Sequence, residues 1–115
     1  MKNLDQLQER VRAFRDARDW KQFHTPKDMA ISLMLEAAEV AELFQWKRDE
    51  ELIDVKGKLG EELSDVLYWV VLLAQDFGVD LSVAFERKMA INEAKYPVET
   101  SKGSAQKYNA KPPST

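Results

Sequence analysis

Hydrophobic residues recur along most of the chain at the three- and four-residue spacing that marks one face of an α-helix. In the first segment these positions are Leu4, Leu7, Val11 and Phe14. They predict an amphipathic helix over about residues 3–18. Asn3 and Gln6 are the residue types of a capping box at its start.

A second helix is predicted after the linker DWKQFHTPK. Thr25 is a favoured N-cap residue and Pro26 suits the first helical position, so we expect the helix to start there. Its apolar pattern continues to about Trp46. The charged stretch 47–58 is predicted to be a connection, with a short helical piece around residues 50–55.

Two more helices follow. The third is predicted over about residues 59–77, with Gly78 as the residue that ends it. The fourth covers about 81–95, capped by Asp80, and Pro97 closes it because proline cannot continue a helix. Since no stretch shows a strand pattern, the predicted fold class is all-α with four main helices.

Composition narrows the class of protein. The 115 residues favour one domain, and the net charge of -3 argues against nucleic acid as the main partner. The absence of cysteine excludes disulfides and thiolate chemistry. No stretch resembles a signal peptide or a transmembrane helix, so we expect a cytoplasmic protein with no membrane partner. Four helices of this size can bury only a small core. Self-association, which would cover more apolar surface, is therefore favoured.

Acidic residues interrupt the apolar faces of the second and third predicted helices. Glu36 and Glu39 do so in LEAAEVAELFQW, and Glu62 and Asp65 in EELSDVL. Side chains three residues apart on a helix have Cβ atoms about 5–6 Å apart. Antiparallel packing of the two helices would therefore make four carboxylates face one another.

Such a cluster needs a partner, because buried charges of one sign repel each other. Mg²⁺ takes oxygen ligands and accepts phosphate oxygens in the rest of its shell, so the pattern predicts a magnesium site. The alternatives are a salt-bridge network to lysines and, for either pair alone, a solvated helix face. Glu42 and Glu61 are predicted to be solvated or to support the site from outside. Asp76 lies about 16 Å along the helix from Asp65, too far for the same metal centre.

Basic and polar residues later in the chain are candidates for contacts with phosphate and sugar. They are Lys88, Asn92, Lys95 and Tyr96 on the fourth predicted helix, and Lys102, Lys107 and Tyr108 after it. The alternative is an exposed helix face followed by a loose tail. Separately, Trp20, His24 and Trp46 could line an aromatic pocket for a base, with core packing as the alternative.

Five stretches, in their order and spacing, resemble the all-α nucleoside triphosphate pyrophosphatases of the MazG-like superfamily, and within it the dCTP pyrophosphatase branch. They are RDWKQFH, EVAELFQW, EELSDVL, KMAINEAKYP and SKGSAQKY. The resemblance covers about residues 4–110. Residues 1–110 are therefore interpreted as a MazG-like nucleotide pyrophosphohydrolase domain and 111–115 as a flexible tail.

The resemblance implies a four-helix bundle completed by subunit association, as a homotetramer built from a dimer of dimers. It implies Mg²⁺-dependent cleavage of the α–β bond of a nucleoside triphosphate, with dCTP preferred. The family's ExxE and ExxD motifs fall on the two acidic pairs chosen above. The implied substrate contacts are Trp20, His24, Trp46, Trp69, Lys88, Asn92, Lys95, Tyr96, Lys102 and Lys107.

Two positions depart from the wider pattern. Leu35 stands where many MazG-type sequences have an additional glutamate, and the dCTP branch also lacks that acid. Trp69, with Tyr68 beside it, stands where the branch usually has a tyrosine. This change bears on the contact with sugar or base, and so on the preference for dCTP.

With the activity that the resemblance implies, our hypothesis is metal-assisted hydrolysis, in which an activated water attacks in line and Glu39 or Glu36 is the general base. A di-iron carboxylate bundle would need Glu-x-x-His motifs, whereas the one histidine, His24, lies in a linker. The remaining alternative is a non-catalytic helical oligomerisation or interaction module. Such a module would not need four acids on its apolar faces.

Overall fold

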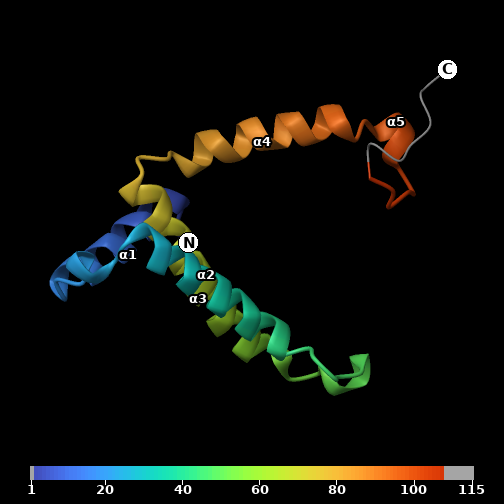
Figure 1. Ribbon diagram of the computed structural model, residues 1–115. Helices are drawn as coiled ribbons and strands as arrows, with labels where there is room; N and C mark the ends of the chain where they lie inside the picture. Colours follow the sequence, from blue (N-terminus) through green and yellow to red (C-terminus); the bar gives the residue numbers. More distant parts are fainter. Residues whose placement is uncertain (1, 108–115) are drawn as a thin grey trace. The chain divides into compact units, whose positions relative to one another are not determined.

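The computed structural model describes residues 2–107, which form helices and turns without a strand (Figure 1). The elements are α1 (Leu4–Ala17), η1 (Lys21–Phe23), α2 (Pro26–Glu42), η2 (Asp49–Glu51), α3 (Val55–Asp76), α4 (Leu81–Lys95) and α5 (Val98–Ser101). The chain divides into two units, one up to Val79 and one from Asp80 onward. The predicted all-α class with four main helices is confirmed.

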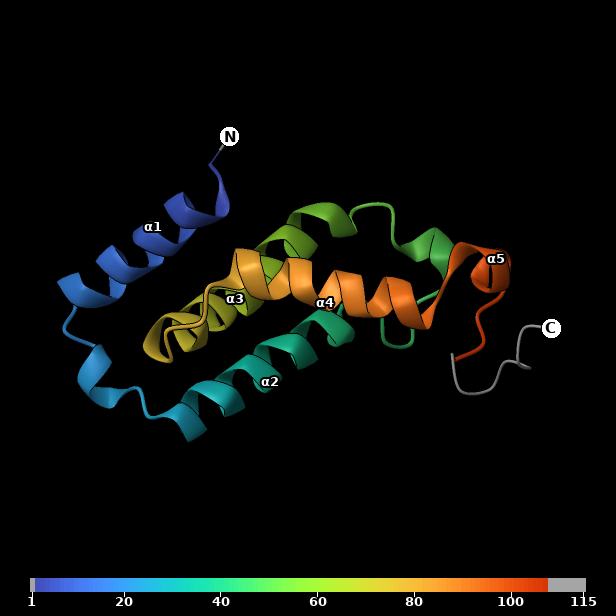
Figure 2. The ribbon, with the colours of Figure 1, turned by 90° about the horizontal axis from the view of Figure 1, so that it is seen from above.

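In the first unit, α2 and α3 run antiparallel and lie side by side, and α1 packs against α3 (Figure 2). Among the described residues, the buried apolar side chains are few: Met29, Val71, Leu72 and Ala74. Large apolar side chains remain exposed on the hairpin of α2 and α3, among them Met34, Leu35 and Leu63. The first unit therefore has a small core and an apolar outer surface.

The helix starts follow from local sequence as predicted. Asn3 and Gln6 form the reciprocal capping box, with N···O distances of 2.8 and 2.9 Å. The Thr25 hydroxyl accepts a hydrogen bond from the backbone N–H of Asp28 at 3.1 Å. The Asp80 side chain caps α4 in the same way. These side chains satisfy backbone donors that the first helical turn leaves unpaired.

Two predicted boundaries were wrong. α2 ends at Glu42, not near Trp46, because the chain tightens there: the N–H of Leu43 bonds to the carbonyl of Val40, three residues back, at 3.2 Å. Trp46 itself has a positive φ of 65°, which no helix continues. α3 begins at Val55, four residues earlier than the apolar pattern indicated.

The first two turns of α3 contain two glycines. Gly57 and Gly60 lie inside the helix, and a Cβ added at either would meet nothing within 4 Å. No close approach therefore requires glycine there. At the other end of α3, Gly78 has a positive φ of 66° and ends the helix as predicted.

The second unit consists of α4 and the segment after it. α4 covers the predicted residues, and Pro97 follows its end. The chain then forms a further short helix, α5 (Val98–Ser101), which the sequence pattern did not predict. Among residues 2–107, no single helix is both long and apolar enough to cross a membrane.

Candidate functional site

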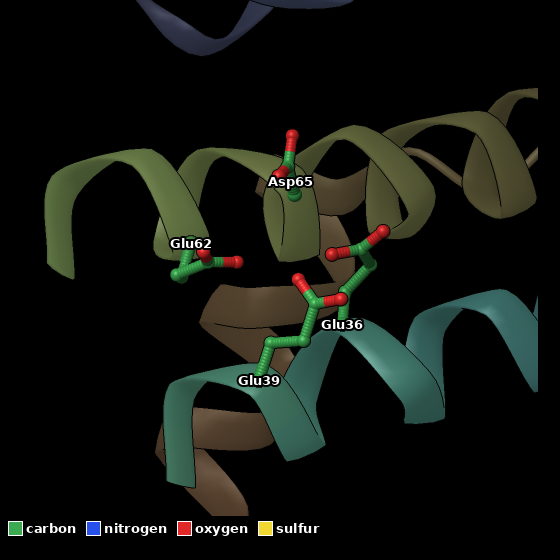
Figure 3. Close-up of side chains that lie close together, drawn as sticks. All are labelled: Glu36, Glu39, Glu62 and Asp65. Carbon is green, nitrogen blue, oxygen red and sulfur yellow. The ribbon is translucent and has the colours of Figure 1, made fainter. Parts of the chain in front are cut away.

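The two acidic pairs meet between α2 and α3. Glu36 and Glu39 project from α2 toward Glu62 and Asp65 on α3 (Figure 3). One carboxylate oxygen from each residue lies within 4.8 Å of the corresponding oxygens of the other three. The predicted convergence is confirmed, and it depends on the antiparallel packing of the two helices.

Burial makes this cluster costly. Within residues 2–107, Oε2 of Glu36 and Oε2 of Glu62 are buried and have no hydrogen-bond partner. Burial raises the pKa of Glu36, helped by a hydrogen bond with Glu39 and by the negative charges of Glu39 and Asp65. A hydrogen bond with Glu39 raises the pKa of Glu62, followed by burial and by the neighbouring negative charges.

A salt-bridge network to lysines is not what holds the acids together. Within residues 2–107, the ion pairs involve other acids, namely Glu9, Glu50, Glu51 and Asp76. The charges that act on Glu36 and Glu62 are all negative. Four converging oxygen donors, two with unpartnered buried oxygens, fit a hard divalent cation. The cluster is thus a candidate metal site.

An aromatic pocket opens beside the acids. It has a volume of about 360 Å³ and is lined by Phe14, Trp20, His24, Asp65, Tyr68 and Trp69. Asp65 belongs to both the acidic cluster and the pocket, so a ligand in the pocket lies next to the candidate metal site. Three of the predicted contact residues, Trp20, His24 and Trp69, come together here.

The rings of the aromatic pocket meet edge to face. His24 and Trp69 have ring centroids 5.2 Å apart, Tyr68 and Trp69 5.1 Å, and Phe14 and Trp20 5.7 Å. Burial lowers the pKa of His24, and the positive charge of Arg15 lowers it further. The imidazole is therefore neutral near pH 7, and the pocket presents apolar faces to a planar ligand.

Trp46 does not line this pocket within one chain, so its predicted grouping with Trp20 and His24 stays a prediction. Trp46 lies beyond the opposite end of α2 and is 92% exposed. The aromatic side chains that take its place are Phe14 and Tyr68. Both were overlooked because helical spacing explains an apolar residue equally well as core.

Tyr68 has two unusual features. Its hydroxyl oxygen is buried and has no hydrogen-bond partner in the part of the chain that the structure describes, and burial raises the pKa of this hydroxyl. It also lines a second, smaller hollow of about 250 Å³ together with Arg10, Val11 and Phe14. The sequence showed Tyr68 as a neighbour of Trp69 but gave no signal for this position.

The second unit carries the predicted basic residues. Lys88, Asn92, Lys95 and Tyr96 lie on α4 or at its end, where the Tyr96 N–H bonds to the Asn92 carbonyl at 2.9 Å. Lys102 and Lys107 are exposed in the segment that follows. Tyr108 lies outside the described residues. The assignment of these residues to phosphate or sugar stays a prediction.

The structure also contains an ion pair that the sequence did not suggest. Arg15 on α1 donates two hydrogen bonds to Asp76 at the end of α3, at 2.6 and 2.9 Å. The hydrogen bond from Arg15 lowers the pKa of Asp76. Asp76 was considered as a metal ligand and set aside on distance, and its place in this pair agrees with that exclusion.

Comparison with known proteins places the chain in a family. The model of the MazG-like family matches residues 31–110. The chain is 46% identical over 105 residues to dCTP pyrophosphatase 1 of Bos taurus and 43% identical over 105 residues to that of Homo sapiens. Each of these alignments covers 86% of the chain and 62% of the relative, so the chain spans less than two thirds of the length of these curated relatives.

A solved structure shows the same fold. A pyrophosphatase from Archaeoglobus fulgidus is 41% identical and superimposes with a TM-score of 0.76, covering 84% of this chain and 94% of that one. The matched region of the family model includes all four acids of the cluster. By sequence and by fold, the chain belongs to the MazG-like family.

Proposed function

We propose that this chain is a nucleoside triphosphate pyrophosphohydrolase that prefers dCTP and needs Mg²⁺. It would cleave the α–β bond with water and release the nucleoside monophosphate and pyrophosphate, thereby controlling or cleaning the nucleotide pool. The observation that carries the proposal is the convergence of four carboxylates beside an aromatic pocket. The dCTP pyrophosphatase 1 relatives support the choice of nucleotide.

The four acids fit magnesium both in the type of ligand atom, which is oxygen, and in the spacing of these oxygens. Mg²⁺ prefers an octahedron of oxygens at about 2.1 Å, so opposite ligands lie about 4.2 Å apart. The four oxygens within 4.8 Å of one another need only small side-chain movements to approach this spacing. Glu36, Glu39, Glu62 and Asp65 would hold the ion, which supplies positive charge for the triphosphate and increases the acidity of water.

The chain's own residues have two further tasks. Glu39 or Glu36 would accept the proton of the attacking water as general base, with the water in line with the departing pyrophosphate. The aromatic pocket would hold the base through ring contacts with Trp20, His24 and Trp69. Trp46 would reach a base only from another subunit, and the phosphate and sugar contacts would come from Lys88, Asn92, Lys95, Tyr96, Lys102 and Lys107.

We further propose that the protein is a cytoplasmic homotetramer, a dimer of dimers, with no nucleic-acid or membrane partner. The apolar side chains left exposed on α2 and α3 support the assembly. The net charge of -3 agrees with a partner other than nucleic acid. Residues 1–110 would form the enzymatic domain, followed by the tail 111–115.

The test is pyrophosphate release from a panel of nucleotides with Mg²⁺: dCTP, 5-methyl-dCTP, dATP, dTTP, dUTP, dGTP and CTP. We expect turnover led by dCTP and lost with EDTA. The Glu39→Gln variant should be folded, by circular dichroism, and inactive. Its matched control is Glu42→Gln, one turn farther along α2 at an exposed position.

The outcomes separate the alternatives. Turnover led by another base would overturn the dCTP preference and point to the aromatic pocket with Trp69. A fully active Glu39→Gln enzyme would remove Glu39 from the site. A folded protein that turns over no nucleotide with Mg²⁺ present would favour the non-catalytic helical module, for which the exposed apolar surface is the supporting observation.

A further inference from the structure

Arg15 is the one charged side chain that is fully buried within residues 2–107, with 1% exposed. Its guanidinium donates from Nη1 to Oδ2 of Asp76 at 2.9 Å and from Nη2 to Oδ1 at 2.6 Å. Asp76 is itself only 14% exposed. Such a two-pronged pair fixes the relative orientation of its partners as well as their distance. It therefore forms a joint between α1 and the end of α3.

The same residue anchors the chain that leads into the aromatic pocket. The carbonyl oxygen of Arg15 accepts hydrogen bonds from the N–H groups of Arg18 and Trp20, both at 3.2 Å. Phe14, its neighbour in sequence, lines the pocket and meets Trp20 edge to face. A movement of Arg15 would thus carry Phe14 and Trp20 with it.

The two charges of the pair have opposite effects on His24, which lines the aromatic pocket. The positive charge of Arg15 lowers the pKa of His24, whereas the negative charge of Asp76 raises it. Burial is the larger influence on this ring. With both partners present, the two charges therefore act in opposite directions on the His24 side of the pocket.

The pair lies away from the acids. Asp76 follows Asp65 by eleven residues on the same helix, which corresponds to about 16 Å along the axis. Within the described chain, none of the four acids of the cluster takes part in the pair. Its loss should therefore disturb the aromatic side of the site before the metal side.

We propose that the Arg15–Asp76 ion pair is a positioning pair. It holds α1 on α3 so that the aromatic pocket keeps the shape that binds the nucleoside part of the substrate. This inference rests on the proposed function and extends it. It assigns a role in nucleotide affinity to two residues that belong neither to the pocket lining nor to the acidic cluster.

The test compares Asp76→Asn with Arg15→Lys. The asparagine removes the negative charge, whereas the lysine keeps the positive charge but cannot make two parallel hydrogen bonds. The matched control is Arg12→Ala, which removes an exposed ion pair with Glu9 from the same helix. If Asp76→Asn does not fold, the milder Arg15→Lys carries the test.

We expect KM for dCTP to rise at least about tenfold in Asp76→Asn, because lost contacts with the nucleoside weaken the binding of substrate and transition state alike. Arg15→Lys should raise KM by a smaller factor. kcat at saturating substrate, and the affinity for Mg²⁺ alone by calorimetry, should stay within about twofold. Binding of dCMP, measured by titration calorimetry without turnover, should weaken in parallel with KM. The control should match the wild type.

A purely structural role would give a different result. It would lower the apparent kcat with the folded fraction and leave KM and dCMP affinity unchanged, which would overturn the inference. Unchanged KM in active variants overturns this inference alone. A wild-type protein that neither binds dCMP nor hydrolyses any nucleotide would overturn the proposed function, and the positioning role with it.

Discussion

At the scale of single residues, Glu36 and Glu62 each have a buried carboxylate oxygen with no hydrogen-bond partner among the described residues. Such an atom loses its contacts with water and gains nothing in return, so it costs free energy in the folded state. The raised pKa of each side chain has the same physical meaning. Near pH 7, a cation bound between these acids would offset this cost.

The first prediction concerns stability without metal. Because the pKa of Glu36 is raised above its ordinary value of 4.5, the folded state binds protons more tightly there than the unfolded state. The contribution of Glu36 to the free energy of unfolding is therefore present below pH 4.5. It is lost as the pH rises through the folded-state pKa of Glu36. Glu36→Gln should raise the melting temperature in EDTA at pH 7 by a few degrees.

Calorimetric melting with and without Mg²⁺ checks this prediction. The wild type should gain stability on addition of Mg²⁺, since a ligand that binds only the folded state stabilises it. The Glu36→Gln variant should gain much less. A variant that melts below the wild type in EDTA would contradict the account of Glu36 as a repelled carboxylate.

The second prediction uses two neighbouring glutamates of α3. Glu62 belongs to the acidic cluster, whereas Glu61 is exposed and points elsewhere on the helix. Glu62→Gln should lower kcat/KM by more than about 100-fold, because even residues that only support metal ligands cost about 10–100-fold. Glu61→Gln should remain within about twofold. Equal effects of the two substitutions on steady-state kinetics would refute the assignment.

At the scale of helices, the Arg15–Asp76 pair joins α1 to α3. The two residues lie 61 positions apart in the sequence. Removing one partner of a buried pair leaves the other charge uncompensated, which costs about 3–5 kcal/mol. We therefore expect Asp76→Asn to lower the free energy of unfolding by about 3 kcal/mol at pH 7. Urea denaturation followed by circular dichroism measures this loss.

The Arg15–Asp76 pair should also affect how the free energy of unfolding falls at acidic pH, which we call the acid limb. The hydrogen bond from Arg15 holds the pKa of Asp76 below its ordinary value of 3.8. The stabilisation by the ion pair is thus complete at pH values above the unfolded-state pKa of Asp76. It is lost as the pH falls through the lower folded-state pKa. Asp76→Asn should flatten the decline in stability below about pH 4. An unchanged acid limb would show that Asp76 does not contribute to it.

The sequence predicted best what depends on neighbouring residues. Thr25 with Pro26 and Asp80 mark helix starts, and Gly78 marks an end, because capping involves atoms only a few positions apart. The acids were found for a similar reason, since Glu36 and Glu39 share a helix face. Their convergence with α3 required only that a short connection bring the helices together.

Contacts between distant segments escaped prediction. Nothing in the pattern indicated that Arg15, on the first amphipathic helix, would be buried against Asp76. Tyr68 and Phe14 looked like ordinary core residues, and Trp46 was grouped with aromatics that lie at the other end of α2. Helical periodicity gives the face of a residue on its own helix but not which distant residue will meet it.

At the scale of the whole molecule, the first unit buries few apolar side chains and leaves large ones exposed. Met34 is 62% exposed on α2 and Leu63 is 50% exposed on α3. A surface of this kind is a common site of association. The proposed homotetramer would cover part of it.

The corresponding prediction is that Met34→Glu weakens association. A charge placed in an apolar contact between subunits loses its hydration, so the dissociation constant should rise at least about tenfold. Lys27→Glu, at an exposed polar position of the same helix, is the control. Sedimentation velocity over a range of concentrations measures both. A wild-type protein that is monomeric at all concentrations would rule out the assembly.

The two glycines of α3 make its two halves unequal. Each glycine weakens a helix by about 1 kcal/mol relative to alanine, and nothing near Gly57 or Gly60 requires the lack of a side chain. The other half of α3 contains the buried Val71 and Leu72. Backbone amides should therefore exchange with deuterium soonest around the glycines and latest around the buried residues. Glu62 lies in the half of α3 that contains the glycines. Binding of a cation to the acidic cluster should therefore slow amide exchange in that half of the helix.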